Sequence, residues 1–183
     1  QHILRDANIF EVDYPSTQKD KLSKIQIHLK NIPENITYVP HNFETDDLNA
    51  SLAIAGYTPS EKTLFILEGV IYFLEKESVE KTLGFIVDNS AKGSSVAFDY
   101  FPPEVISGTT TDRLGKEMNK FARKNGEPYK FGIEPDGIDN FLKRYSFKRI
   151  YKRSTKEMRD DYFHGDNKKR KVSKLFNFVR AIT

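Results

Sequence analysis

Two carboxylates stand near the start of the chain, within residues 9–15, which read IFEVDYP. The apolar residues around them predict a strand, and Pro15 predicts that the strand stops before a helix. In an open α/β sheet, an acid at the carboxyl end of a strand suits the ribose hydroxyls of a nucleoside. We place Asp13 on such a ribose, and we expect Glu11 to face the other side of the sheet or a neighbouring element.

Polar and aromatic residues also follow three further segments that are typical of strands. They are His41, Asn42 and Phe43 after the second segment, Glu68, Gly69 and Tyr72 after the third, and Asp99 and Tyr100 after the fourth. The carboxyl ends of parallel strands meet at one edge, where an amide can pair with an adenine and Phe43 can cover the base. The alternative is that strands simply stop where solvent begins, and the residues alone leave both interpretations open.

Glu68 is the most informative single position in this set. It follows the apolar run TLFIL at residues 63–67 and precedes Gly69 and a second apolar run at 70–74. A carboxylate flanked by so much apolar surface is costly unless a partner compensates its charge, and a cationic ligand would do so. The alternative is an acid at a helix N-terminus that backbone amides satisfy. Tyr72 and Tyr100 are candidates for substrate contacts, unless each is a packed aromatic with its hydroxyl at the surface.

The elements that position these residues alternate in type. Strands are expected at 9–13, 36–39, 63–67, 94–100, 147–151 and 175–182, and the continuous apolar run at 63–67 predicts a strand covered on both faces. Helices are expected between them: one with Leu22, Ile25, Leu29 and Ile32 on its apolar stripe, three capped by Thr45, Asp112 and Asp136, and others at 79–87 and 155–162. This order predicts a mostly parallel α/β sheet with helices on both faces. We expect one domain over residues 1–183, with 102–133 as a lid or insertion over the strand ends.

The composition limits the available chemistry. The chain has 183 residues, of which 38% are hydrophobic and 30% charged, and it carries a net charge of +3. It contains no Cys, which excludes disulfides, thiolate metal sites and a Cys nucleophile. Its four His residues lack metal-ligand spacing, so we expect no metal site. There is no run of about 18 apolar residues and no signal-peptide pattern, so we expect a cytoplasmic protein without membrane contact.

A basic run, KKRK at residues 168–171, is the main local excess of charge. Such a run could contact phosphates, but a charge run in a loop is usually a solvated connection. The nearby aromatics Phe176 and Phe178 fit a closing strand better than a platform for stacking bases. We therefore do not expect this chain to bind nucleic acid.

Three segments together resemble the leucine carboxyl methyltransferase family. They are FEVDYP at 10–15, VPHNF at 39–43 before an acidic helix start, and FILEGVIYFL at 65–74; GSSVAFDY at 93–100 resembles the strand that follows. The resemblance covers residues 1–100 well and the remainder weakly. It implies a Rossmann-like class I methyltransferase fold and S-adenosylmethionine as cofactor. The implied activity is O-methylation of a carboxyl group, on a polyketide-like small molecule or on a protein C-terminus.

The resemblance also implies roles for single residues. Asp13 would bind the ribose of the cofactor, Asn42 and Phe43 would lie at the adenine, and Glu68 would lie near the cationic methionine part. The family usually has Asp where this chain has Asn42. A carboxylate acceptor is already ionised at pH 7 and needs no strong base. No catalytic residue is assigned.

The resemblance further implies that the family's first strand and its Gly-rich turn are absent from this chain. That strand would lie between the strand ending at Asp13 and the strand ending at Glu68, and the two edges left free would need a partner. Three outcomes stay open for these edges: they pair directly, they receive a strand from another chain, as in a homodimer, or they remain poorly stable. A chain that is inactive as it stands also stays open. Two alternatives stay open: a degenerate relative that acts through association without cofactor, and a dinucleotide enzyme, in which the segment around Glu68 has no clear role.

Overall fold

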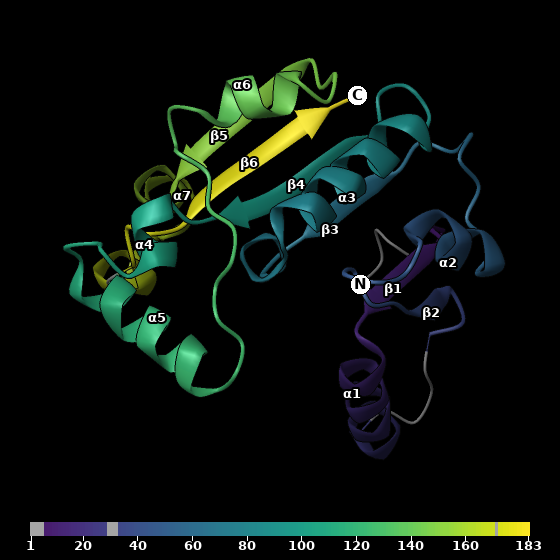
Figure 1. The fold of residues 1–183 in the computed structure, drawn as a ribbon, viewed down its shortest axis with the longest axis horizontal. Coiled ribbons are helices and arrows are strands. Elements are labelled where there is room, and N and C mark those ends of the chain that lie inside the picture. The colour runs from purple at the N-terminus through teal and green to yellow at the C-terminus, as the bar shows by residue number, and fades with distance from the viewer. Residues whose placement is uncertain (1–5, 29–32, 171) are drawn as a thin grey trace. The chain divides into compact units, whose positions relative to one another are not determined.

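The computed structural model describes residues 6–28, 33–170 and 172–183 (Figure 1). The chain divides into two compact units, Gln1–Pro59 and Ser60–Thr183, and each is described by itself. The helical stripe predicted at Leu29 and Ile32 lies outside the described residues. Among the residues that the structure describes, no helix combines the length and the apolar character of a membrane span.

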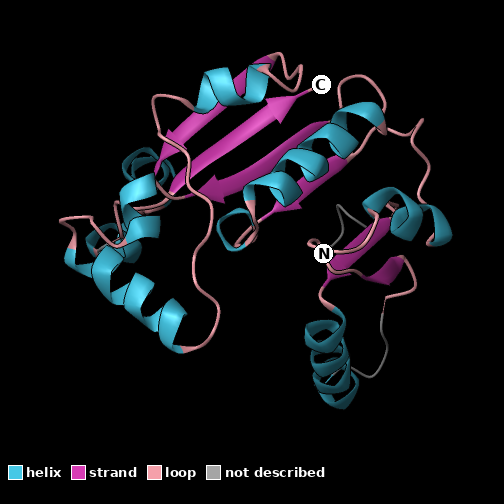
Figure 2. Cartoon of the chain, in the orientation of Figure 1, coloured by secondary structure: helices cyan, strands magenta, loops and turns pink. Residues whose placement is uncertain are grey.

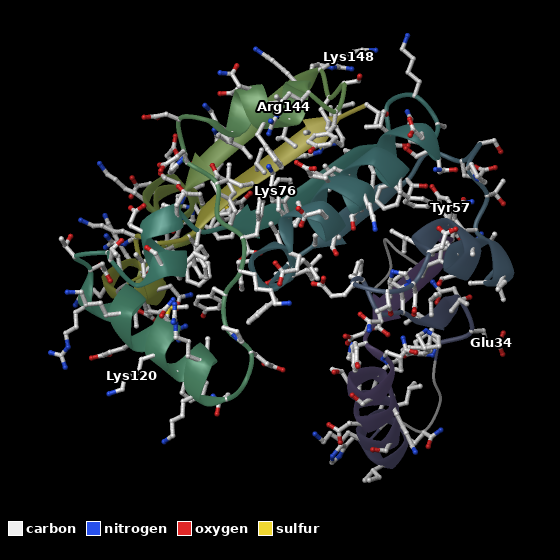
Figure 3. All side chains as sticks on the ribbon, in the orientation of Figure 1. Glu34, Tyr57, Lys76, Lys120, Arg144 and Lys148 are labelled. Carbon is white, nitrogen blue, oxygen red and sulfur yellow. The ribbon has the colours of Figure 1, made fainter. Side chains whose placement is uncertain are left out.

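The first unit is built on a pair of parallel strands. Its elements are β1 (Ile9–Asp13), α1 (Pro15–His28), β2 (Ile36–Pro40) and α2 (Leu48–Ile54). The strands pair from Ile9 opposite Ile36 to Asp13 opposite Pro40, so α1 is the crossover of a βαβ unit. The ring of Tyr57, labelled in Figure 3, stands edge-on to Phe10 of β1 with centroids 5.7 Å apart. This contact ties the end of the unit back to its sheet.

The second unit contains a four-stranded sheet. Its strands are β3 (Leu64–Leu67), β4 (Ser95–Tyr100), β5 (Arg149–Ser154) and β6 (Asn177–Ile182). They follow the order β3-β4-β6-β5, with β3 parallel to β4 and with β6 antiparallel to both of its neighbours. Strands β3, β4 and β5 therefore run in one direction and β6 in the other.

Helices connect and cover these strands. They are η1 (Ile71–Phe73), α3 (Lys76–Asp88), α4 (Pro103–Ser107), α5 (Arg113–Lys124), α6 (Ile138–Lys143), α7 (Thr155–Tyr162) and η2 (Gly165–Lys169). Figure 2 shows α3 and α6 lying over one face of the sheet. The segment expected to form a lid, 102–133, contains α4 and α5, and its role as a lid stays a prediction.

The core of the second unit lies between the sheet and these two helices. Val96 and Phe98 of β4 point into it, where α3 contributes Leu83 one helical turn before its buried Ile86. Alternation along β3 turns Leu64 and Ile66 to the other face, where they are 56% and 65% exposed. The prediction that this strand is covered on both faces is therefore wrong for this chain, since only one face is covered.

The strand and helix order predicted from the sequence is confirmed, with bounds that differ by a few residues. Two predicted caps are wrong. Asp47 rather than Thr45 caps α2, because its carboxylate accepts a backbone N–H of the first turn, and Gly137 rather than Asp136 precedes α6. Asp112 caps α5 as predicted.

Candidate functional site

At the carboxyl end of β1, two carboxylates share one cation. Nζ of Lys21 on α1 lies 2.9 Å from Oδ2 of Asp13 and also contacts Oε1 of Glu11. The hydrogen bond to Glu11 is the largest cause that raises the pKa of Lys21. Side chains two residues apart in a strand share a face, so Glu11 lies on the side of Asp13. Of the two alternatives expected for Glu11, the contact with a neighbouring element is confirmed, since it meets Gln18 and Lys21 of α1.

Asp13 keeps capacity for a ligand at this position. Its side chain is 28% exposed, with Oδ2 on Lys21 and with Oδ1 accepting the backbone N–H of Tyr14 at 2.8 Å. An ionised carboxylate can accept about four hydrogen bonds, so these two partners leave acceptor sites. The geometry is compatible with a bidentate grip on two hydroxyls, in which Lys21 would set the orientation of the carboxylate.

The turn after β2 uses Asn42 for its own geometry. Oδ1 of Asn42 accepts the backbone N–H of Glu44 at 3.0 Å, and the N–H of Asn42 donates to Oδ2 of Asp46 at 2.9 Å. These are the bonds of an Asx-type turn, in which a short amide side chain replaces a backbone acceptor. The oxygen of Asn42 is thereby committed to the turn, so its amide nitrogen is the atom left to meet an adenine edge.

Phe43 is held in place by a buried histidine. The ring of His41 stands edge-on to that of Phe43, with centroids 4.8 Å apart, and His41 is 1% exposed. Nδ1 of His41 lies 3.0 Å from Oγ of Ser51, and burial lowers the pKa of His41. The imidazole is therefore neutral at pH 7 and supports Phe43 from inside the unit, which favours a structural role over a ligand contact.

In the second unit, three polar groups meet at the carboxyl ends of β3 and β4. Asp99 is 5% exposed, and its Oδ1 accepts the backbone N–H of Gly69 at 2.7 Å. The carboxylate also accepts the hydroxyl of Tyr72. Glu68, which precedes Gly69, is exposed and close enough for its charge to act on both Asp99 and Tyr72.

The electrostatics of this edge are negative. Burial raises the pKa of Asp99 above its ordinary value, the hydrogen bond from Gly69 opposes that shift, and the charge of Glu68 adds to it. Burial, and next the charge of Asp99, raise the pKa of Tyr72, so its hydroxyl stays a donor at physiological pH. Two carboxylates at neighbouring strand ends attract a cation and repel an anion.

Tyr72 belongs to an aromatic cluster rather than to the surface. Its ring stacks on Phe101 with centroids 4.4 Å apart, and Tyr129 stands edge-on to it at 5.3 Å. The backbone also joins there, since Lys130 N–H donates to the carbonyl of Tyr72 at 2.8 Å and Ile133 N–H to that of Phe101 at 2.9 Å. We call residues 129–133 the strap; they cross the ends of β3 and β4.

Tyr100 lies apart from this group. It is 2% exposed on the face of β4 that the helices cover, opposite to the face of Asp99. Burial raises its pKa to about 12, and the charges of Asp139 and Asp136 contribute. A substrate contact of Tyr100 stays a prediction, and the packing of its side chain gives it no support.

The candidate residues thus form two sets. Asp13, Asn42 and Phe43 lie at the strand ends of the first unit, while Glu68 and Tyr72 lie together in the second. Asp99 was predicted to lie at the end of a strand, but no role was assigned to it. The signal in the sequence is its position as an acid at the end of an apolar strand. Tyr129 had no signal beyond an aromatic residue in a polar loop. In the described parts of the chain, no three His, Asp or Glu side chains gather closely enough to hold a metal ion.

Comparisons with known proteins find sequence similarity to methyltransferases. The family model described as leucine carboxyl methyltransferase matches residues 2–87. The chain is 25% identical over 174 residues to YktD of Bacillus subtilis, whose name places it among the S-adenosyl-L-methionine-dependent methyltransferases. This match covers 95% of the chain but 57% of the relative, so the chain spans little more than half of that protein's length.

Solved structures share the fold at low sequence identity. An O-methyltransferase family protein from Burkholderia thailandensis has a TM-score of 0.58 and 9% identity, covering 94% of this chain and 42% of that one. Human N-acetylserotonin methyltransferase in complex with S-adenosylmethionine has a TM-score of 0.52 and 13% identity, covering 99% and 42%. The solved structures show that this chain has a class I methyltransferase fold, and its sequence is similar, over residues 2–87, to the leucine carboxyl methyltransferase family and, more widely, to proteins named as S-adenosylmethionine-dependent methyltransferases.

Proposed function

We propose that this chain carries part of the cofactor site of an S-adenosylmethionine-dependent O-methyltransferase. The observation that carries the proposal is the carboxylate of Glu68, which is presented at the end of β3 beside buried Asp99. The methionine part of the cofactor bears two cationic groups, a sulfonium and an ammonium. A negative strand edge inside a methyltransferase fold is the complement of such a ligand.

The first unit, taken by itself, carries candidate contacts for a nucleoside. Asp13 would accept the ribose hydroxyls, and the ring of Phe43 would cover the adenine. Asn42 would donate its amide to the base edge, since its oxygen is engaged in the turn. The cofactor, when bound, would supply the methyl group that an acceptor oxygen displaces from sulfur, with one C–O bond formed as the C–S bond breaks.

The protein's own contribution would be orientation, charge and exclusion of water. A carboxylate acceptor is ionised at pH 7, so no side chain has to remove a proton. Glu68 and Asp99 would repel such an acceptor until the cationic cofactor offsets their charge, which favours binding of the cofactor first. We propose a carboxyl group of a polyketide-like small molecule or of a protein C-terminus as the acceptor, with residues 102–133 selecting it.

Calorimetric titration with S-adenosylhomocysteine tests the cofactor site. We expect a saturable heat for the chain and an affinity about tenfold lower for Asp13→Ala, because the ribose loses charge-assisted hydrogen bonds worth about 1.5 kcal/mol. Asp20→Ala is the matched control, since Asp20 is an exposed residue of α1 and pairs with Lys24. Absence of heat at high ligand concentration would contradict cofactor binding by this chain, although the family kinship would stand.

A second candidate function is association without cofactor. Among the described residues β3 pairs with β4 alone, and its Leu64 and Ile66 are exposed. An outer strand that exposes apolar side chains is a template for pairing with another chain. Sedimentation velocity should then show a homodimer that Ile66→Lys converts to a monomer, with exposed Ile54→Lys of α2 as the control. A parent chain that sediments as a monomer at every concentration would refute this candidate.

A further inference from the structure

We propose that Asp99 is a positioning residue of this site. Its carboxylate accepts the backbone N–H of Gly69, which fixes the turn that presents Glu68. It also accepts the hydroxyl of Tyr72, which fixes the ring against which Tyr129 of the strap packs. The role rests on the proposed function in one respect, namely that Glu68 contacts the cofactor. Neither the family match over residues 2–87 nor the resemblance assigns a role to Asp99.

The turn after β3 is the first observation that carries this inference. Gly69 has φ of +71°, a left-handed conformation that a side chain would strain. A Cβ added there would lie 3.6 Å from the Tyr72 hydroxyl, which is ordinary contact, so the backbone angle and not space requires the glycine. The bond of 2.7 Å between Gly69 N–H and Asp99 is charge-assisted and anchors this turn to the neighbouring strand.

The burial of Asp99 is the second observation. A carboxylate that is 5% exposed is costly unless hydrogen bonds satisfy it, and an apolar residue would avoid that cost. The other two β4 residues on this face, Ser95 and Ala97, are small and uncharged. Position 99 therefore differs from its strand neighbours in charge and size, and the donors that it meets besides its own backbone N–H both belong to the segment that follows β3.

The third observation is that the contacts of Asp99 extend through Tyr72 to the strap. The Tyr72 hydroxyl bonds to Asp99 while its carbonyl accepts the N–H of Lys130 and its ring packs on Tyr129. Asp99 therefore joins the turn that carries Glu68 to the strap. The titratable groups that face Asp99 are Glu68 and Tyr72, and its cross-strand neighbour on β6 is Phe178, which carries no charge.

The first test needs no cofactor. We expect the amide proton of Gly69, followed by NMR against pH in the whole chain, to titrate with Asp99 at a midpoint above the ordinary Asp value of about 3.9. In Glu68→Gln the titration should persist with a lower midpoint, because a neighbouring negative charge has been removed. In Asp99→Asn this titration of the Gly69 amide should vanish. A Gly69 amide that shifts alike in Asp99→Asn and in the parent would overturn the proposal.

The second test separates positioning from general support of the fold. We expect Asp99→Asn to weaken binding of S-adenosylhomocysteine about tenfold in the parent chain but by less than about twofold in the Glu68→Gln background. If Asp99→Asn lowers the affinity by the same factor in both backgrounds, a role through Glu68 is refuted. Asp160→Asn, at an exposed residue, is the matched control. If the parent binds no S-adenosylhomocysteine, the proposed function fails, while the Gly69 titration still decides whether Asp99 holds the turn.

Discussion

Replacing Glu68 by glutamine should lower the affinity for S-adenosylmethionine about ten- to hundredfold, which corresponds to about 1.4 to 2.8 kcal/mol. The substitution keeps the shape of the side chain and removes its charge, so the loss measures the attraction between this carboxylate and the cationic methionine part. S-adenosylhomocysteine lacks the sulfonium charge and should lose less. Calorimetric titration with both ligands at two salt concentrations gives the comparison, and the difference should shrink as salt screens the exposed group.

The control for this prediction is Glu61→Gln, which removes a charge from an exposed residue of the same unit. Its affinities should equal those of the parent chain. Equal losses for both ligands in Glu68→Gln would place the carboxylate at the ammonium group, away from sulfur. Unchanged affinity for both ligands would remove Glu68 from the cofactor site, and with it the observation on which the proposed function rests.

The sequence predicted those elements of the fold that depend on local pattern. Apolar spacing and Pro15 placed β1 and α1, and the alternation of strand and helix patterns up to residue 100 placed β2, β3 and β4. Caps were less certain, because Thr45 and Asp47 are both good capping types two residues apart and only the backbone selects one. Of the two alternatives for Glu11, the period of two in a strand already favours the one that the structure confirms, in which it shares a face with Asp13 and contacts α1.

Contacts between distant residues could not be derived from one sequence. The strap meets Tyr72 across more than fifty positions, and no local signal marks Tyr129 as its partner. The sequence also does not reveal whether a strand is covered on one face or on both. The run at 63–67 is apolar throughout, yet other elements cover only one of its faces. Asp99 shows the same limit at a single residue, because its burial and its bond to Gly69 arise when β3 and β4 pair.

Replacing Phe101 by alanine should lower the free energy of unfolding of the second unit by about 3–5 kcal/mol. The side chain is 0% exposed, and its ring stacks on Tyr72 at 4.4 Å and meets Phe176 at 4.8 Å. Removing it leaves a cavity where η1, the strap and the segment before β6 converge. Chemical denaturation, followed by a probe in the second unit, measures the loss.

The exposed ring of Phe121 on α5 gives the matched control, because it is 70% exposed and its removal should change stability by less than about 0.5 kcal/mol. In Phe101→Ala, hydrogen exchange should quicken first at Lys130 and Ile133, whose N–H groups bond to the carbonyl of Tyr72 beside the cavity and to the carbonyl of residue 101 itself. The strap packs closely against α4 at Gly132, where an added Cβ would lie 2.7 Å from Ile106. Exchange that quickens equally throughout the unit would show that the ring stabilises the fold as a whole and does not stabilise the strap in particular.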